Sequence, residues 1–222
     1  MRRSAEADGY PRQVKTLDHV ALWVADRGQM TDAAGRIGLR VIEQTERFTL
    51  LGADARRGKL TLFDAEGPRE RGALERIGLR VSALDGREPV IDLGEGLELV
   101  LVEAETDSEL DLDHVVLRSA DPAAAAVQWQ ALGFSPGDNG RLEVGGAWLE
   151  LRQGDPGSPE RPLLNHLGVL VDSVEEQQAE AEELGVEIAD FIDAPNTLAL
   201  FVWGPDRVKL EYIEHKPSFS LT

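Results

Sequence analysis

The chain has 222 residues, contains no cysteine, and carries a formal net charge of −18 from 41 acidic and 23 basic residues. This length suits one large domain or two small ones, and without cysteine only histidine and carboxylate side chains remain as strong metal ligands. The acidic charge argues against nucleic-acid binding, which needs a positively charged surface. No apolar run approaches the roughly 20 residues of a membrane-spanning helix, and no secretory signal is recognisable, so we expect a cytoplasmic protein.

The first half of the chain predicts a polar leader and two structural units. Residues 1–14 lack any periodic pattern and are expected to be flexible. The first unit begins at residue 17 with the strand Leu-Asp-His-Val-Ala-Leu, followed by a helix between Asp26 and Gly38 and by three strands within residues 41–63. The second unit begins at residue 74 with Leu-Glu-Arg-Ile-Gly-Leu and lacks a clear helix.

The second half repeats this order twice, after an acidic segment at residues 104–111 that we expect to be a linker. The third unit begins at residue 112 with Leu-Asp-His-Val-Val-Leu, and the fourth begins at residue 164 with Leu-Asn-His-Leu-Gly-Val. Both continue with a helix and then strands. The repeat predicts an α+β fold of four tandem βαβββ modules, the second degraded, that pair into two curved mixed sheets with helices outside.

The expected domains follow from this repeat. Residues 15–103 would form an N-terminal domain, residues 112–215 a C-terminal domain, and residues 216–222 a tail.

Three of the four histidines occupy the same position of the repeated motif, namely His19, His114 and His166. Because side chains alternate along a strand, each C-terminal unit should present its histidine and one glutamate on the face away from its helix. If these two units pair side by side, four residues would line one cavity: His114, Glu150, His166 and Glu211. Imidazole and carboxylate ligands suit Fe(II), Mn(II), Zn(II), Ni(II) or Co(II).

The repeated βαβββ unit, the LDHVVL and LNHLGV strands and the closing GPDRVKLEYIE resemble the vicinal oxygen chelate superfamily. This group includes glyoxalase I, bleomycin-resistance proteins, methylmalonyl-CoA epimerases and extradiol dioxygenases. The resemblance covers residues 15–214, and the four-unit plan is most similar to a two-domain extradiol dioxygenase. It implies a divalent metal, Fe(II) or Mn(II) before zinc, nickel or cobalt, held by His114, His166 and Glu211.

Two departures from the dioxygenase pattern leave alternatives open. The strand at residues 198–203 lacks the tyrosine that this subfamily uses, and Glu150 occupies the place of a fourth ligand or base in glyoxalases and epimerases. A lyase or isomerase is therefore an alternative, and so is a metal-free, bleomycin-resistance-like protein whose acidic cleft binds a cationic drug. Glu150 could instead form a plain ion pair with Arg152. His19 has no carboxylate partner in its own half and is interpreted as a structural relic.

The expected partner is a small-molecule substrate, with neither nucleic acid nor membrane, and the chain could be a monomer or a homodimer. Side chains on the faces of the expected cavity are candidates for its wall: Arg118, Trp148, Phe201, Trp203 and Lys209.

Overall fold

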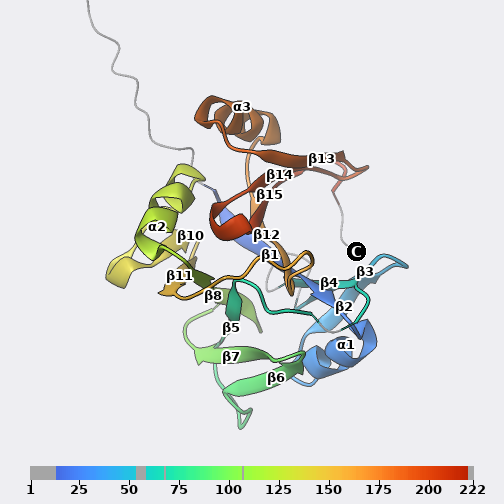
Figure 1. Ribbon diagram of the computed structural model, residues 1–222. Coiled ribbons are helices and arrows are strands. Elements are labelled where there is room, and N and C mark those ends of the chain that lie inside the picture. Colours follow the sequence, from blue (N-terminus) through green and yellow to red (C-terminus); the bar gives the residue numbers. More distant parts are fainter. Residues whose placement is uncertain (1–13, 54–58, 68, 107, 220–222) are drawn as a thin grey trace, which may run out of the picture.

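The computed structural model describes residues 14–53, 59–67, 69–106 and 108–219, which form two mixed β-sheets with helices on their outer sides (Figure 1). Three α-helices and no closed barrel occur in this part of the chain, which confirms the expected α+β fold. The leader expected at residues 1–14 lies outside the described residues except for Val14, which is buried. None of these helices is long and apolar enough to cross a membrane.

Eight strands form the first sheet, in the order β13 (Ile188–Asp193), β14 (Thr197–Trp203), β15 (Lys209–His215), β12 (Leu164–Leu170), β1 (Thr16–Val24), β4 (Lys59–Asp64), β3 (Phe48–Gly52) and β2 (Arg40–Gln44). Seven strands form the second, in the order β6 (Val90–Gly94), β7 (Leu97–Glu103), β5 (Leu74–Val81), β8 (Asp111–Ser119), β11 (Ala147–Gln153), β10 (Leu142–Val144) and β9 (Ser135–Pro136).

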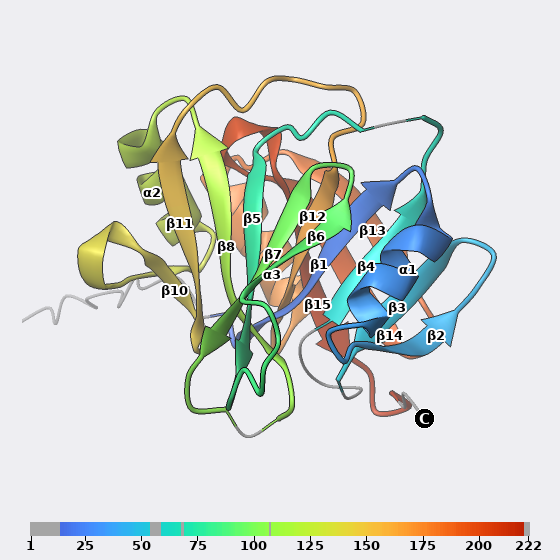
Figure 2. The ribbon, with the colours of Figure 1, turned by 90° about the horizontal axis from the view of Figure 1, so that it is seen from below.

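The units pair differently from the expectation. β1 of the first unit runs antiparallel to β12 of the fourth, and β5 of the second runs antiparallel to β8 of the third. Figure 2 shows the blue β1 beside the orange β12, and the teal β5 beside the yellow-green β8. The prediction that the third and fourth units pair is therefore wrong. Alternation of apolar residues indicates which face of a strand is buried, but it does not identify the strand's partner in a distant unit.

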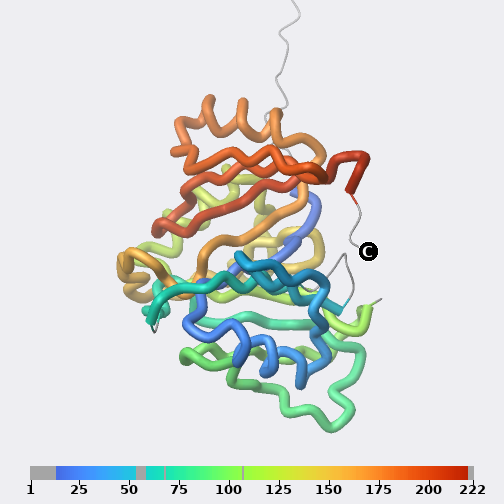
Figure 3. Tube along the Cα trace, turned by 90° about the vertical axis from the view of Figure 1, so that its right-hand side faces the viewer, coloured from blue at the N-terminus to red at the C-terminus, as the bar shows by residue number. Residues whose placement is uncertain are grey.

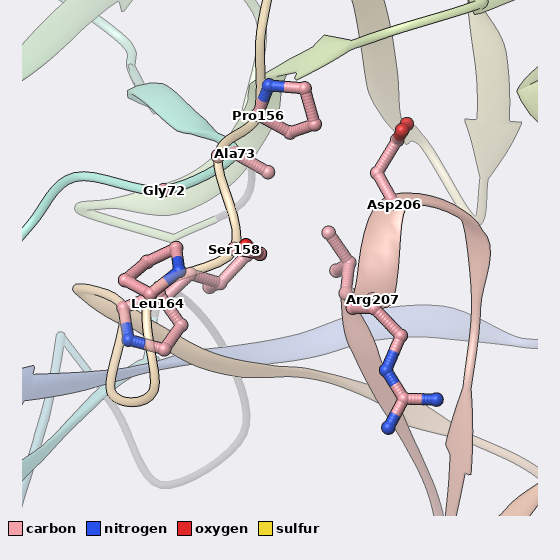
Figure 4. A pocket seen from close by; sticks show the side chains of 11 residues that line it. Gly72, Ala73, Pro156, Ser158, Leu164, Asp206 and Arg207 are labelled. Carbon is pink, nitrogen blue, oxygen red and sulfur yellow. The ribbon is translucent and has the colours of Figure 1, made fainter.

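Each sheet consequently takes strands from both expected halves of the chain. The linker expected at residues 104–111 does not divide two domains, because β7 before it and β8, which begins at Asp111, belong to one sheet. The chain passes from one sheet to the other between β4 and β5, and again between β11 and β12. These two crossover segments touch, because the Leu163 amide donates to the Glu70 carbonyl at 2.9 Å. Figure 4 shows them on one side of a small pocket, with Asp206 and Arg207 of the short 3₁₀ helix η2 (Pro205–Arg207) opposite.

The helices begin where the sequence places their caps. Asp26, Asp121 and Ser173 accept backbone hydrogen bonds at the starts of α1 (Arg27–Gly35), α2 (Pro122–Ala131) and α3 (Val174–Leu184). Figure 3 shows the orange α3 along the outside of the orange and red strands of the first sheet. A second 3₁₀ helix, η1 (Asp138–Gly140), precedes β10. The inner faces of the sheets are thus left free for functional side chains.

A β-bulge recurs in the first strand of all four units. The register with the partner strand slips by one residue at Asp18, Glu75, Asp113 and Asn165, in each case directly before the repeated histidine position. A bulge inserts one extra residue and re-aims its side chain. Strict alternation therefore fails at this point, and the polar residue can reach the side chain that follows it.

Candidate metal centre

Three side chains from three adjacent strands converge on the inner face of the first sheet: His19 on β1, His166 on β12 and Glu211 on β15. The two Nε2 atoms are 2.9 Å apart, and Glu211 Oε2 lies 3.2 Å from the Nε2 of His19 and 3.0 Å from that of His166. All three residues are at most 9% exposed. This is a compact and almost buried ligand set.

The bulge residues fix both imidazoles. Asp18 Oδ2 lies 3.0 Å from Nδ1 of His19, and Asn165 Oδ1 lies 3.0 Å from Nδ1 of His166. Both oxygens are acceptors, so Nδ1 carries the hydrogen in each ring and Nε2 presents its lone pair to the centre. Lys59, which is buried, donates to Asp18 Oδ1 at 2.6 Å and holds that carboxylate in place. A hydrogen bond of this kind to the other ring nitrogen usually orients a metal-binding histidine.

The spacing of the three ligand atoms fits one face of an octahedron. With metal–ligand bonds of about 2.1 Å, neighbouring ligands of an octahedral ion are separated by about 3.0 Å. The observed separations of 2.9, 3.0 and 3.2 Å match this value. Two histidines and one carboxylate on one face leave the opposite face for substrate, which is the arrangement of the facial triad.

Without a metal, a proton has to occupy the centre. Burial opposes a charge on His19, but the carboxylates of Asp18 and Glu211 outweigh it and raise the pKa of this imidazole to about 9. Burial, together with the charge of His19, lowers the pKa of His166. Burial also opposes ionisation of Glu211, but the two histidines outweigh it and lower the pKa of its carboxyl to about 2. At neutral pH the proton on His19 therefore stands where a cation would bind.

Gly168 makes the close approach of β1 and β12 possible. It lies opposite His19 in the strand register, and a Cβ on it would be 2.4 Å from Cε1 of the imidazole. Only glycine leaves room for the ring at this position. Gly168, in the LNHLGV strand, is thus part of the site, because it allows the His19 ring of β1 to lie across β12.

The position equivalent to Glu211 in the first unit is Thr61. Glu211 lies beside Gly168 of β12, and Thr61 lies beside Ala21 of β1 in the same parallel arrangement. A fourth carboxylate ligand would be expected here in a four-ligand centre. The threonine, which is buried, leaves a set of three strong protein ligands.

Aromatic rings surround His166 on the same face. The centroid of Phe201 lies 5.2 Å and that of Phe63 6.3 Å from the His166 ring. Trp23 and Phe48 extend this wall, with centroids 5.5 and 6.0 Å from Phe63. An apolar wall beside a cluster of polar ligands is the usual composition of a small-molecule site.

The structure divides the residues that the sequence placed in one cavity. His166, Glu211, Phe201, Trp203 and Lys209 belong to the eight-stranded sheet, as expected for one site. The remaining candidates belong to the seven-stranded sheet: His114, Arg118, Trp148 and Glu150.

The grouping of His114 and Glu150 with His166 is therefore wrong, because β8 pairs with β5 and not with β12. Glu150 instead accepts from Arg152 Nε at 2.5 Å, as the ion-pair alternative anticipated.

His19 is the candidate ligand that the sequence interpretation missed. It has no carboxylate partner within its own unit, but Glu211 of the fourth unit lies 3.2 Å away. The Asp-His dipeptide was a usable signal, because a carboxylate next to a histidine can fix its tautomer wherever the strand carries a bulge.

Solved structures share this fold across nearly the whole chain. A protein from Bacillus subtilis, provisionally assigned as a dioxygenase, superposes with a TM-score of 0.73 at 16% identity, covering 93% of this chain and 87% of its own. Glyoxalase I from Zea mays superposes with a TM-score of 0.68 at 16% identity, covering 90% and 92%. The cppA protein from Streptococcus pneumoniae gives 0.59 at 15% identity, covering 91% and 100%.

No protein-family model and no curated protein matches the sequence. The fold is thus shared with a protein provisionally assigned as a dioxygenase and with glyoxalase I, as the repeated sequence motifs predicted.

Proposed function

We propose that the protein is a divalent-metal-dependent enzyme of the vicinal oxygen chelate type that acts on a small substrate with two neighbouring oxygens. The observation that supports this most is the convergence of three acceptor atoms, on His19, His166 and Glu211, at the spacing of an octahedral face. Three lone pairs facing one another in a buried site repel unless a cation or a proton lies between them. Fe(II) or Mn(II) fits this ligand set best.

The number of ligands favours oxygen chemistry of the extradiol dioxygenase kind over a four-ligand isomerase or lyase. Thr61 stands where the fourth carboxylate would be, so three coordination positions remain for substrate and dioxygen. When bound, the ion would act as a Lewis acid toward the two substrate oxygens. Phe63 and Phe201 would pack against a flat substrate beside His166.

Lys209 would place a positive charge near the substrate. It lies on β15 two residues from Glu211, on the same face, and its charge acts on His166. Its ammonium is 5.0 Å from the Trp203 ring, which holds the side chain along the sheet. A cation in this place would favour binding of the substrate as an anion.

Metal analysis of protein purified without chelators tests the proposal first. We expect one equivalent of a divalent ion in the native protein and in His114→Ala, and strong loss of it in His19→Ala and His166→Ala. Retention of the ion in both of the last two variants would contradict the site.

Oxygen consumption with catechols by the iron-loaded protein then tests the reaction. Its absence, together with isomerisation of a hemithioacetal, would favour the glyoxalase-type alternative. Tight binding of a basic glycopeptide that does not depend on metal would favour the drug-binding alternative.

A further inference from the structure

The seven-stranded sheet repeats the geometry of the metal centre with different side chains. His114 lies over Gly78 of β5, as His19 lies over Gly168, and a Cβ on Gly78 would be 2.2 Å from the His114 ring. The bulge residue Asp113 holds Nδ1 of His114 at 2.7 Å. The third unit has therefore kept an oriented histidine outside the metal centre.

The other positions on this face no longer suit a metal ion. Arg76 stands at the repeat position of the second histidine, and a guanidinium always carries its proton and offers only donors. Glu150 stands at the repeat position of Glu211, but Arg152 already donates to it. The repeat positions that would attract a cation in the eight-stranded sheet therefore present positive charge in the seven-stranded sheet.

Three arginines lie together on this face. Arg76 of β5 is opposite Val116 of β8, Arg118 follows two residues later on β8, and Arg152 of β11 is in register with Arg118. Arg152 Nη1 also donates to Glu75 Oε1 of β5 at 2.7 Å, so its guanidinium extends across β8 between the other two strands. Diagonal neighbours in a sheet are about 7–8 Å apart, within reach of long side chains.

Two of these arginines lack an acidic partner. Arg152 binds both Glu150 and Glu75, whereas Arg76 and Arg118, both half-buried, form no side-chain hydrogen bond or ion pair with any residue that the structure describes. This is unusual in a chain with 41 acidic and 23 basic residues, where carboxylates are abundant. Neighbouring unpaired guanidinium groups repel each other, and the two-oxygen edge of an oxyanion relieves this with bidentate hydrogen bonds.

We propose that Arg76 and Arg118 form a binding site for a small molecule with an oxyanion group, a carboxylate or a phosphate, separate from the metal centre. His114 lies four residues before Arg118 on β8 and therefore on the same face, and its Nε2 has no hydrogen-bond partner among the residues that the structure describes. Trp148, stacked on His114 at a centroid distance of 4.3 Å, borders the site. The net charge of −18 repels anions from the molecule as a whole, so binding should be confined to this local concentration of arginine.

Titration calorimetry with two probes, inorganic phosphate and benzoate, tests the site. The protein used is His166→Ala, because this removes the metal centre and prevents either probe from binding there. We expect saturable binding of at least one probe with a stoichiometry of one. Binding of phosphate alone identifies a phosphate ligand, and binding of benzoate alone identifies a carboxylate ligand.

Substitution of the arginines assigns the binding to this face. Arg76→Met and Arg118→Met should each weaken binding at least about 10-fold, while Arg76→Lys, which keeps the charge but not the two-donor edge, should weaken it less than Arg76→Met. Arg47→Met, at an exposed turn of the other sheet, is the matched control and should bind as the parent does. Absence of binding by both probes, or equal affinity in all variants, would overturn the proposal. Since the metal centre is absent throughout, neither result bears on the proposed enzyme activity.

Discussion

Substitution of Gly168 by alanine tests which of two histidines at the same repeat position, His19 or His114, binds the metal ion. The added Cβ would lie 2.4 Å from Cε1 of His19, whereas carbon atoms in contact are separated by about 3.5 Å or more. The imidazole would therefore have to move by roughly 1 Å. Metal–ligand bonds tolerate deviations of only about 0.2 Å, so we expect the bond from His19 to the ion to be lost.

The expected loss of metal affinity is about 100-fold or more, because removing a residue that only hydrogen-bonds to a metal ligand already costs about 10–100-fold. Overpacking should also lower the free energy of unfolding of the metal-free protein by about 1–3 kcal/mol. Competition with a chromophoric chelator measures the first quantity, and thermal unfolding of the metal-free protein measures the second. His19→Ala, which removes the ligand while keeping Gly168, should reproduce the loss of affinity without the steric strain.

Gly78→Ala is the matched control. Its Cβ would lie 2.2 Å from His114 in the other sheet, so the strain is comparable but the metal centre is untouched. We expect similar destabilisation and unchanged metal affinity. If Gly78→Ala weakened metal binding as much as Gly168→Ala, or if neither variant weakened it, the assignment of His19 as a ligand would be refuted.

Four further predictions concern the same structure. Lys59→Met should weaken metal binding about 10-fold, measured by chelator competition, because Asp18 would no longer be held against His19. Metal binding at pH 7 should release nearly one proton, measured by calorimetry in buffers of different ionisation enthalpy, because the pKa of His19 is raised to about 9 in the metal-free protein. For the same reason the proton on His19 stabilises the metal-free protein below about pH 6.5, and this contribution should disappear as the pH rises through 9, which chemical unfolding at several pH values would show. Tyr212→Phe should lower the free energy of unfolding by about 1–2 kcal/mol in the same assay, because it leaves the buried Leu132 carbonyl without its 2.9 Å partner.

The sequence predicted the repeated unit, the helix caps and two of the three residues that converge at the candidate metal centre. These features are local: Asp26, Asp121 and Ser173 cap helices through residues three positions away, and His166 and Glu211 belong to one unit. Periodicity and capping are encoded within a few residues, so they can be interpreted without knowledge of the partner strands.

The third ligand depends on a contact between residues 147 positions apart, His19 and His166. Pairing of the third with the fourth unit would have given an apparently better ligand set, with His114 and Glu150 beside His166. Gly78 and Gly168 each make room for a histidine ring of the opposite strand, but a glycine in a strand does not identify which distant histidine lies over it. The choice between the two pairings lies in the packing of the whole core and not in any one motif.

Strict alternation misled the interpretation at one more point. It assigned Asp113 and His114 to opposite faces of their strand, whereas the bulge brings Asp113 Oδ2 to 2.7 Å from the ring. A bulge adds one residue without changing the hydrophobic pattern around it, so the sequence shows it only through the polar residue itself.

The pairing of the first unit with the fourth also affects how the chain can fold while it is being synthesised. β1 emerges from the ribosome among the first strands, yet its neighbour β12 follows more than one hundred residues later, and Glu211 later still. Non-local pairing of this kind slows folding, and the edge of β1 that does not face β4 is open to aggregation until β12 has been made. An ion bound between β1, β12 and β15 would hold the first strand of the fold against strands of the last unit and stabilise their pairing. Metal supply during expression should then influence the yield of folded protein.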